Sequence, residues 1–363
     1  MKILIFQKKV PSYRVDFFNS LFFYSNQNVL VYSPCEKLGS LTNTSLDNKD
    51  WLKKKGKNIS LLKSLNLEWQ TDLYDIKINK NDIVVIPGNP RDLGYFYLFI
   101  KLKLKGVKVI IWTQYWSHTS SKFGFYIRRF LFNFFSGIIF YTEKEALQYL
   151  NDEKGKVKIP VIGLNNGLNF DLISSKSIVY NAFNRGDNVV FIGRLTKKSN
   201  LDQLIISLSM CDLIKPTLHI IGDGDELSNY RELIKLYNVN AIFYGSLTDE
   251  DDISSIMNKC SLFVYPGAVG LSLIHAMSYG VPAIIHDDFQ SHGPESAALV
   301  NGITGIVFKK DSIESLAHTI SQVLKNKKNL NNLSNESIKL IKENFNIKSM
   351  ARQFLTLIDR VGN

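Results

Sequence analysis

A short basic stretch offers the clearest chemistry in this sequence. In VVFIGRLTKKSNLDQ (189–203), a strand-like run ends at Gly193, Arg194 and Lys198 follow, and a helical pattern begins near Asn200. Cations that converge with the N–H groups of a helix start would bind a phosphate-bearing ligand. A basic loop that only contacts water is the alternative for this stretch taken alone.

Two acidic residues mark the next junction between a strand and a helix. In IIGDGDELSNY (220–230), Asp223 and Asp225 alternate with Gly222 and Gly224. An Asp-x-Asp pair can bind a divalent metal ion, but acids at a helix start also stabilise the helix without any ligand. The sequence favours a glycine turn followed by such acids, so we expect no metal ion and no other cofactor.

An uncharged run surrounds a single histidine. SLFVYPGAVGLSLIHAMSYGVPAII (261–285) has no Asp, Glu, Lys or Arg, and His275 lies in its middle. The run is long enough for a membrane span. However, its glycines and prolines divide it into pieces of strand or short-helix length. The run therefore predicts a buried strand, a glycine turn, a helix and a second buried strand.

Each of these junctions must be positioned by a sheet. Strand-like runs alternate with helical patterns through both halves of the chain, which predicts parallel sheets with crossover helices. The predicted fold class is α/β with two doubly wound Rossmann-like domains, whose ligands bind at the carboxyl ends of the strands in a central cleft. We expect one domain over 1–165, a polar linker over 163–177, a second domain over 166–345, and an amphipathic C-terminal helix (346–363) that packs back on the first.

Composition and charge limit the function classes. With 363 residues, 45% hydrophobic and 12% aromatic, the chain is too long for one ordinary core and too apolar for a disordered protein. Cys35, Cys211 and Cys260 have no metal-type spacing and indicate buried thiols in a reducing compartment. The N-terminal MKILIFQ predicts a strand rather than a signal peptide, so we expect a cytoplasmic protein.

The positive charge is concentrated in the first half. Residues 1–165 carry 25 Lys and Arg against 13 Asp and Glu (net +12), whereas the remainder carries 19 against 20 (net −1). This asymmetry indicates attraction of the first half to anionic lipid or diphosphate groups. A lysine-rich surface that only faces water is the alternative. We expect no nucleic-acid partner.

Several linked motifs resemble one known family. GRL, HIIGDGDE, FYGSLTDEDD, SLFVYPG, GLSLIHAMSYGVPAI and GPESAALVNGITGIVF occur in the order and spacing of the nucleotide-sugar-binding domain of glycosyltransferase family 4. The similarity is strong from about residue 188 to 308. In the first half it is limited to the alternation of strands and helices, PSYRVDFF and WTQYWSH. The resemblance implies a GT-B fold, retention of anomeric configuration, and a nucleoside diphosphate sugar as donor.

The sequence departs from the family pattern at two acids. The family usually reads Glu-Gly-Phe-Gly-Leu-x-x-x-Glu-Ala-Met, and alignment places Gly267 at the first acid and His275 at the second. The family lysine after GRL falls on Ser199, with Lys198 one place earlier, whereas Arg194 matches the diphosphate-binding arginine. The donor site implied by the resemblance comprises Arg194, Lys198, Ser199, Gly222, Gly224, Gly267, Gly270, Leu271, Ser272, His275 and Glu295.

His275 can perform part of the role of the family acid that it replaces. In the family the second acid accepts hydrogen bonds from the ribose of the nucleotide, and a histidine can still accept one through a ring nitrogen. The backbone of Gly267 would still approach the donor sugar. The alternative is that His275 is a core residue of an inactive domain.

The first half contributes the predicted acceptor side. His118 follows a strand in WTQYWSH and resembles the family histidine that lies against the transferred sugar, so we assign His118 and Arg194 as catalytic residues. In QKKVPSYR, Lys8, Lys9 and Arg14 would present positive charge to the acceptor. FGFYIRRFLFNFF (123–135) would rest on a membrane surface or pack its aromatic side chains in the core.

The sequence thus predicts a metal-independent, retaining GT-B glycosyltransferase of bacterial surface polysaccharide (O-antigen or capsule) biosynthesis. Its expected partners are a nucleoside diphosphate sugar, a lipid-linked saccharide acceptor, and an anionic membrane surface at the inner face of the bacterial cytoplasmic membrane. A non-catalytic subunit that binds sugar nucleotides, a GT-B epimerase and an inverting transferase are the alternatives.

Overall fold

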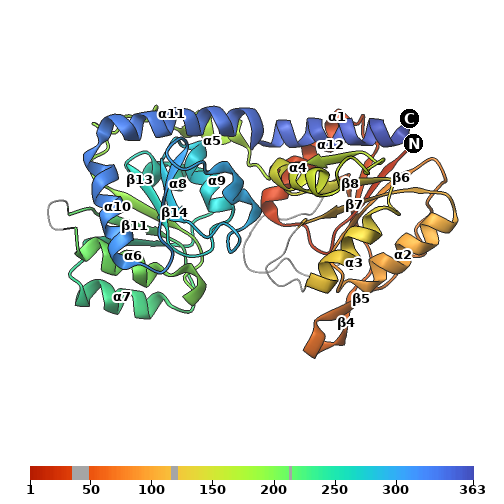
Figure 1. The fold of residues 1–363 in the computed structure, drawn as a ribbon, viewed down its shortest axis with the longest axis horizontal. Coiled ribbons are helices and arrows are strands. Elements are labelled where there is room, and N and C mark those ends of the chain that lie inside the picture. Colours follow the sequence, from red (N-terminus) through yellow and green to blue (C-terminus); the bar gives the residue numbers. More distant parts are fainter. Residues whose placement is uncertain (35–48, 116–121, 212–214) are drawn as a thin grey trace. The chain divides into compact units, whose positions relative to one another are not determined.

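The chain folds into two compact units (Figure 1). The computed structural model describes residues 1–34, 49–115, 122–211 and 215–363. Unit 1 comprises residues 1–165 and 347–363, and unit 2 comprises residues 166–346. The final helix therefore belongs to the same unit as the N-terminus.

Unit 1 is built on a parallel sheet, which has seven strands within the described residues. Their order is β3-β2-β1-β6-β7-β8-β9. The strands are β1 (Ile3–Phe6), β2 (Val29–Ser33), β3 (Leu52–Lys54), β6 (Ile83–Pro87), β7 (Lys108–Thr113), β8 (Gly137–Phe140) and β9 (Val161–Gly163). Since the chain moves outward from β1 to β3 and then returns to β6, the order of the strands reverses between β1 and β6.

Helices cover both faces of this sheet because successive strand residues point to opposite sides. Ile3 and Ile5 pack under α1 (Val15–Tyr24) and α12 (Ile347–Gly362). Leu4 and Phe6 lie in the core of the other face, which is covered by α2 (Leu93–Leu104), α3 (Lys122–Phe132) and α4 (Glu143–Asp152).

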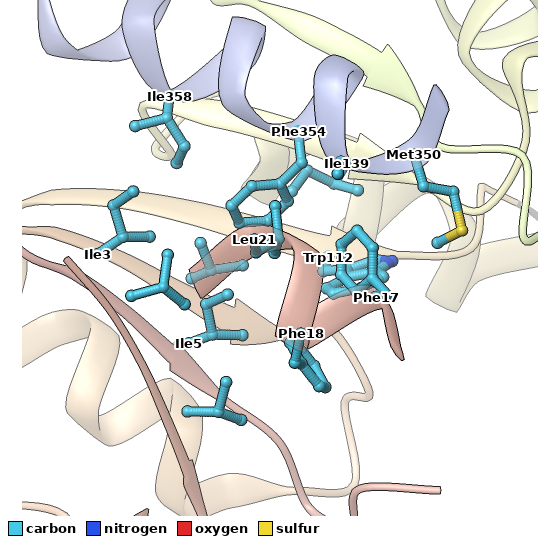
Figure 2. Packing of buried hydrophobic residues seen from close by; sticks show 14 of the residues in the cluster. Ile3, Ile5, Phe17, Phe18, Leu21, Trp112, Ile139, Met350, Phe354 and Ile358 are labelled. Atoms are coloured by element: carbon cyan, nitrogen blue, oxygen red, sulfur yellow. The ribbon is translucent and has the colours of Figure 1, made fainter. Parts of the chain in front are cut away.

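The C-terminal helix completes the core of unit 1. Figure 2 shows Phe354 of α12 next to Phe17 of α1, and the two rings meet edge-on with their centroids 6.0 Å apart. Met350 and Ile358 of α12 belong to the same cluster and are almost fully buried. Removal of α12 would therefore expose the core beneath α1.

Unit 2 repeats the architecture with a parallel sheet of six strands in the described residues. The order is β12-β11-β10-β13-β14-β15, so the reversal lies between β10 and β13. The strands are β10 (Val189–Ile192), β11 (Leu218–Ile221), β12 (Ala241–Gly245), β13 (Leu262–Tyr265), β14 (Ala283–His286) and β15 (Gly305–Phe308). The helices are α5 (Phe170–Lys176), α6 (Leu201–Ser209), α7 (Leu227–Leu236), α8 (Glu250–Met257), α9 (Leu271–Ser278), α10 (Ile313–Lys325) and α11 (Lys327–Asn344).

The uncharged run has the predicted local structure. It forms β13, α9 and β14, and its helix ends before Gly280, whose φ of +69° favours glycine. Leu273 and Ile274 of α9 are fully buried. The run is thus a βαβ core segment rather than a membrane span.

Two segments differ from the expectation. The predicted polar linker contains α5, which is capped by the Asn169 side chain and buries Ile173 against the sheet of unit 2. Residues 58–70 form an antiparallel pair, β4 (Asn58–Leu62) and β5 (Leu67–Gln70), separate from the main sheet. Both segments are short and polar in part, so their hydrophobic periodicity is too weak to reveal them.

Candidate functional site

The carboxyl edge of the unit 2 sheet brings two of the predicted motifs together. Ligands of doubly wound sheets bind outside the carboxyl ends of the strands where the strand order reverses. In unit 2 this point is served by residues 193–200 after β10 and residues 266–270 after β13. A Cβ atom on Gly267 would lie 2.1 Å from the Lys198 carbonyl oxygen. The two loops therefore touch through their backbones.

The glycine loop after β11 contacts the backbone of the loop after β10. Gly222 and Gly224 have φ values of +149° and +159°. A Cβ atom on Gly222 would lie 1.9 Å from the Gly193 carbonyl oxygen, and one on Gly224 would lie 2.3 Å from that of Leu195. Glycine is therefore needed at both positions for steric as well as conformational reasons. These predicted site residues shape the loop by backbone contact.

The cations of the basic stretch are exposed beside these loops. Arg194 and Lys198 both have exposed side chains, and neither forms an ion pair with another residue in the described ranges. Ser199 is buried instead, and its hydroxyl donates to the Thr196 carbonyl at 2.5 Å. Ser199 thus shapes the turn, whereas the two cations face solvent.

A histidine that the sequence did not single out joins two further loops. The Val269 N–H donates to His292 Nδ1 at 3.1 Å, and the Gly293 N–H donates to the Val269 carbonyl at 2.8 Å. Burial lowers the pKa of His292, so the ring is neutral and its Nε2–H faces the His286 carbonyl at 3.0 Å. This arrangement holds the segment before α9 against residues 286–295. Only the spacing of two histidines before the GPE motif hints at it in the sequence.

The two histidine rings also stack. Their centroids are 3.8 Å apart, and burial, with His292 nearby, lowers the pKa of His286 to about 4. Because both rings are neutral near pH 7, they support the loop by packing and hydrogen bonds rather than by charge.

Glu295 places a carboxylate beside the start of α9. It lies in the short 3-10 helix η4 (Pro294–Ala298), is buried, and accepts a hydrogen bond from Asn166 Nδ2 through Oε1 at 2.8 Å. Its other oxygen, Oε2, lies 3.8 Å from the position of a Cβ atom on Gly270, the residue that precedes the helix. The structure therefore brings Glu295 and Gly270 together. Leu271 and Ser272 follow as the first two residues of α9 and are partly buried.

His275 has an acidic partner on a neighbouring helix. Its Nε2 lies 2.8 Å from Glu250 Oε1, and the Tyr279 hydroxyl donates to the same oxygen at 2.5 Å. Burial raises the pKa of Glu250, but the hydrogen bonds from His275 and Tyr279 oppose it and leave the pKa below its usual value. Glu250 is therefore ionised at neutral pH. A contact between α8 and α9 cannot be read from the spacing of residues in the sequence.

The predicted residues of unit 1 have different surroundings. Lys8 Nζ lies 2.7 Å from Glu68 Oε2 and 3.4 Å from Asp92 Oδ1. Arg14 is 6% exposed, and its Cζ lies 4.4 Å from the centre of the Trp112 ring. Lys9 is exposed. The three cations thus do not form one open cluster, because two of them are held by protein partners.

One predicted site residue, a metal ion and a membrane span remain to be considered. His118 lies outside the described residues. Within those residues, no group of three or more His, Cys, Asp or Glu side chains is arranged to hold a metal ion. Asp223 Oδ1 accepts a hydrogen bond from the Gly224 N–H at 2.8 Å. No helix in the described ranges has the length and apolar character to cross a membrane.

Comparison with known families and proteins covers most of unit 2. Residues 176–340 match the family model described as "Glycosyl transferases group 1". The chain is 23% identical over 225 residues to an uncharacterized glycosyltransferase of Methanocaldococcus jannaschii, a match that covers 59% of this chain and 55% of that protein. The chain thus spans about half the length of this relative.

A second relative comes from a bacterium. The chain is 26% identical over 269 residues to a 41.2 kDa protein in the cps region of Klebsiella pneumoniae, covering 69% of this chain and 71% of that protein. This match extends beyond the segment covered by the family model.

Solved structures resemble the whole chain. Anabaena HepE in complex with UDP has a TM-score of 0.70 at 15% identity, and the match covers 99% of this chain and 100% of that chain. The apo form of the lipopolysaccharide outer core galactosyltransferase WaaB also has a TM-score of 0.70 at 15% identity, covering 99% of each chain. At these identities the likeness concerns the fold, and the predicted class of two Rossmann-like domains is confirmed.

Proposed function

We propose, from the premise that this chain contains a glycosyltransferase group 1 domain and has the GT-B fold, that it transfers a sugar from a nucleoside diphosphate to a lipid-linked saccharide. The proposed reaction retains anomeric configuration and belongs to bacterial surface polysaccharide biosynthesis, as in O-antigen or capsule assembly. The cps-region relative and the lipopolysaccharide role in the name of WaaB support this pathway.

One observation carries the proposal. The loops after β10, β11 and β13 meet through glycine backbone at the reversal point of unit 2, and exposed Arg194 and Lys198 lie on one of them. Such an edge binds phosphate groups through N–H groups and cations. The donor diphosphate would lie against Arg194, Lys198 and the start of α9 after Gly270. HepE, which shares the fold, was solved with UDP.

The same groups would promote departure of the diphosphate. Negative charge builds on this leaving group as the bond to the sugar breaks, and fixed cations and N–H groups stabilise that charge. They supply the positive charge that a metal ion provides in other transferases, so the proposed reaction needs no metal. The acceptor would attack from the face that the diphosphate leaves, and the leaving phosphate would take the acceptor proton. His118 would lie against the transferred sugar.

His275 and Glu250 together would bind the ribose. Glu250 is ionised and accepts from Nε2. In the neutral form of the His275 ring, the proton therefore lies on Nε2 and Nδ1 is a hydrogen-bond acceptor. A ribose hydroxyl can donate to this nitrogen, as it donates to an acid in the related family pattern. Glu250 is then a positioning residue that selects the tautomer. Glu295, close to Gly270, would take part in holding the sugar of the donor.

Unit 1 would contact the anionic membrane that carries the acceptor. Tyr97, Ile100 and Leu104 of α2 are spaced by three and four residues on one helical face and are exposed, Leu104 by 85%. Phe130 of α3 is also exposed, by 63%. Apolar side chains next to the lysines of α2 suit the inner face of the bacterial cytoplasmic membrane, where a lipid-linked acceptor is found.

A ligand and product screen tests the proposal. The full chain is mixed with UDP- and GDP-sugars, and a donor at a hundred times its Kd should stabilise it by about 2.7 kcal/mol. Transfer to a lipid-linked saccharide is then followed, and the anomer of the product is determined by NMR. Activity should survive EDTA. Binding without turnover would point to the non-catalytic alternative, an inverted product to an inverting enzyme, and absence of any sugar-nucleotide binding would refute the proposal.

A further inference from the structure

Unit 1 encloses a cavity of 540 Å³ at the carboxyl ends of β6 and β7. Pro87 and Gly88 from the end of β6, Trp112 and Thr113 from β7, and Arg128 of α3 contribute to its wall. The volume is in the range of small-molecule sites. The described residues that line it all belong to unit 1.

The cavity is positively charged and has no balancing acid in its wall. Arg91 and Arg128 line it, and no Asp or Glu occurs among the described residues that do so. A third cation, Arg14, lies behind the wall: its Cζ is 4.4 Å from the centre of the Trp112 ring and 5.5 Å from that of Tyr141. Within the described residues, the Arg14 guanidinium donates to Gln7 Oε1 at a long 3.4 Å and forms no ion pair.

Two residues that line the cavity, and Arg14 next to the Trp112 ring, have nitrogen donors without acceptors among the described residues. Trp112 Nε1, Arg128 Nε and Arg14 Nε are buried, and none has a hydrogen-bond partner within the residues that the structure describes. Buried donors normally find acceptors, and each exception needs an explanation. The two donors of the lining residues belong to an indole and a charged guanidinium, so a partner in the cavity should be rich in oxygen and negatively charged.

The rest of the wall is apolar. Phe96, Ile111, Leu131 and Phe132 line the cavity, and Ile127 continues this surface on α3 with 44% exposure. A small inorganic anion would leave these side chains without contacts. The wall therefore suits a ligand that combines an anionic group with a hydrocarbon chain.

We infer that this cavity is the acceptor site and that it binds the phosphate or diphosphate ester group of an acceptor with an apolar chain. Arg128, Arg91 and the Trp112 indole N–H would hold the phosphate oxygens, and Arg14 would add charge from behind Trp112. The inference rests on the proposed function for the role of the ligand, but the chemistry of the cavity stands on its own contacts.

Calorimetry on the full chain tests the inference with geranyl diphosphate as the probe. Saturating UDP is present throughout, because a diphosphate could otherwise enter the donor site of unit 2. Geranyl diphosphate should bind at least about tenfold more tightly than geraniol, which lacks the anion, and than inorganic pyrophosphate, which lacks the chain. Equal binding of geraniol would overturn the anionic assignment, and equal binding of pyrophosphate would overturn the apolar one.

Two variants locate the probe. Arg128→Gln removes a cation from the wall but also a hydrogen bond to the Tyr115 carbonyl, whereas Arg91→Gln changes an exposed side chain with little risk to the fold. Each should weaken geranyl diphosphate about tenfold or more. Lys105→Gln, at an exposed position after α2 outside the cavity, removes the same charge and should have no effect. Parental affinity in Arg91→Gln and in a folded Arg128→Gln would overturn the inference.

A third variant separates this inference from the proposed function. Arg194→Ala should leave the affinity for geranyl diphosphate unchanged, because Arg194 belongs to unit 2. If the chain transfers sugar while the cavity variants bind the probe normally, the cavity assignment is wrong and the transferase stands. If the probe binds as expected and no sugar nucleotide does, the cavity assignment stands and the transferase is wrong.

Discussion

The two sheets have the same kind of topology, but backbone loops form the carboxyl edge in unit 2 and side chains form it in unit 1. In unit 2, three loops meet through glycine backbone, the cations Arg194 and Lys198 face solvent, and the nearby acids Glu250 and Glu295 are already paired. In unit 1, side chains line a cavity, and two of their buried nitrogen donors, Trp112 Nε1 and Arg128 Nε, lack acceptors within the described residues.

The difference shows how one fold can serve two ligands. Backbone loops such as those of unit 2 recognise a group that many donors share, because N–H groups and cations bind any diphosphate. A cavity formed by side chains can be selective, because its shape and charge change with single substitutions. Variants at the two edges should therefore have different signatures.

The largest effect is expected from the exposed arginine of unit 2. Arg194→Ala should reduce transfer by about two orders of magnitude or more, because a cation that stabilises the leaving group is lost. Lys339→Ala, at an exposed position of α11, is the control and should retain parental turnover. Steady-state kinetics on both variants checks this. Near-normal turnover of Arg194→Ala would remove the diphosphate assignment.

The second largest effect is expected when an acid of the family pattern is introduced at position 267. Gly267→Glu restores the residue of the family pattern, yet its Cβ would lie 2.1 Å from the Lys198 carbonyl oxygen. The substitution should therefore lower the free energy of unfolding by about 1–3 kcal/mol or more and abolish donor binding. Ala268→Glu adds the same charge at an exposed neighbouring position and should cost much less. Thermal denaturation compares them, and a stable, active Gly267→Glu would show that the loops separate easily.

Loss of the histidine should weaken the donor directly. His275→Ala should reduce donor affinity by about 1–3 kcal/mol, the usual result of deleting one partner of a buried hydrogen bond. His275→Glu places a carboxylate beside Glu250 and should bind donor no better than the alanine variant, whereas His275→Glu combined with Glu250→Gln should recover affinity. Calorimetry measures all three. If all are folded and bind like the parent, His275 is a core residue.

The contribution of Glu250, the partner of His275, to the free energy of unfolding should depend on pH. The pKa of Glu250 is lowered in the folded chain, so its contribution to stability is present above the unfolded value near 4.5 and is lost as the pH falls through the lower folded value. Glu250→Gln should therefore cost about 1–3 kcal/mol at pH 7 and progressively less below pH 4.5. Urea unfolding at several pH values tests this, and a difference that does not change with pH would exclude a stabilising role for the ionised Glu250 carboxylate.

The smallest effect concerns the surface of unit 1. The full chain should bind anionic vesicles, and binding should weaken as salt is added because exposed charges are screened beyond about 8–10 Å. Leu104→Gln should lower vesicle affinity by about 1–2 kcal/mol, whereas Leu236→Gln on unit 2 should not. The two leucines are comparably exposed, at 85% and 74%. Equal behaviour of both variants would show that the α2 face only contacts water. The full chain is required, because a fragment ending at residue 165 lacks α12 and hence part of the unit 1 core.

Much of the fold follows from local pattern. Alternating apolar runs and helical periods predicted both parallel sheets, and Gly270 and Gly280 lie within two residues of the ends of α9. The basic stretch and the glycine loop were also placed correctly at strand ends, because a glycine after an apolar run permits the tight turn that ends a strand. The hairpin β4–β5 and α5 were missed because their apolar residues are too few to show a period.

The site was predicted less completely, and the physical reason is the same in each case. Sequence alone determined where the key residues stand: Arg194 and Gly267 just after strands, and His275 in the helix that follows Gly270. Only the tertiary structure decided what those residues touch. The pairing of His275 with Glu250, the contact of Gly267 with the backbone of Lys198, and the stacking of Arg14 on Trp112 each join segments that are distant in the chain. Such contacts depend on how helices and loops pack over the sheet, and packing is a property of the whole unit rather than of any local run of residues.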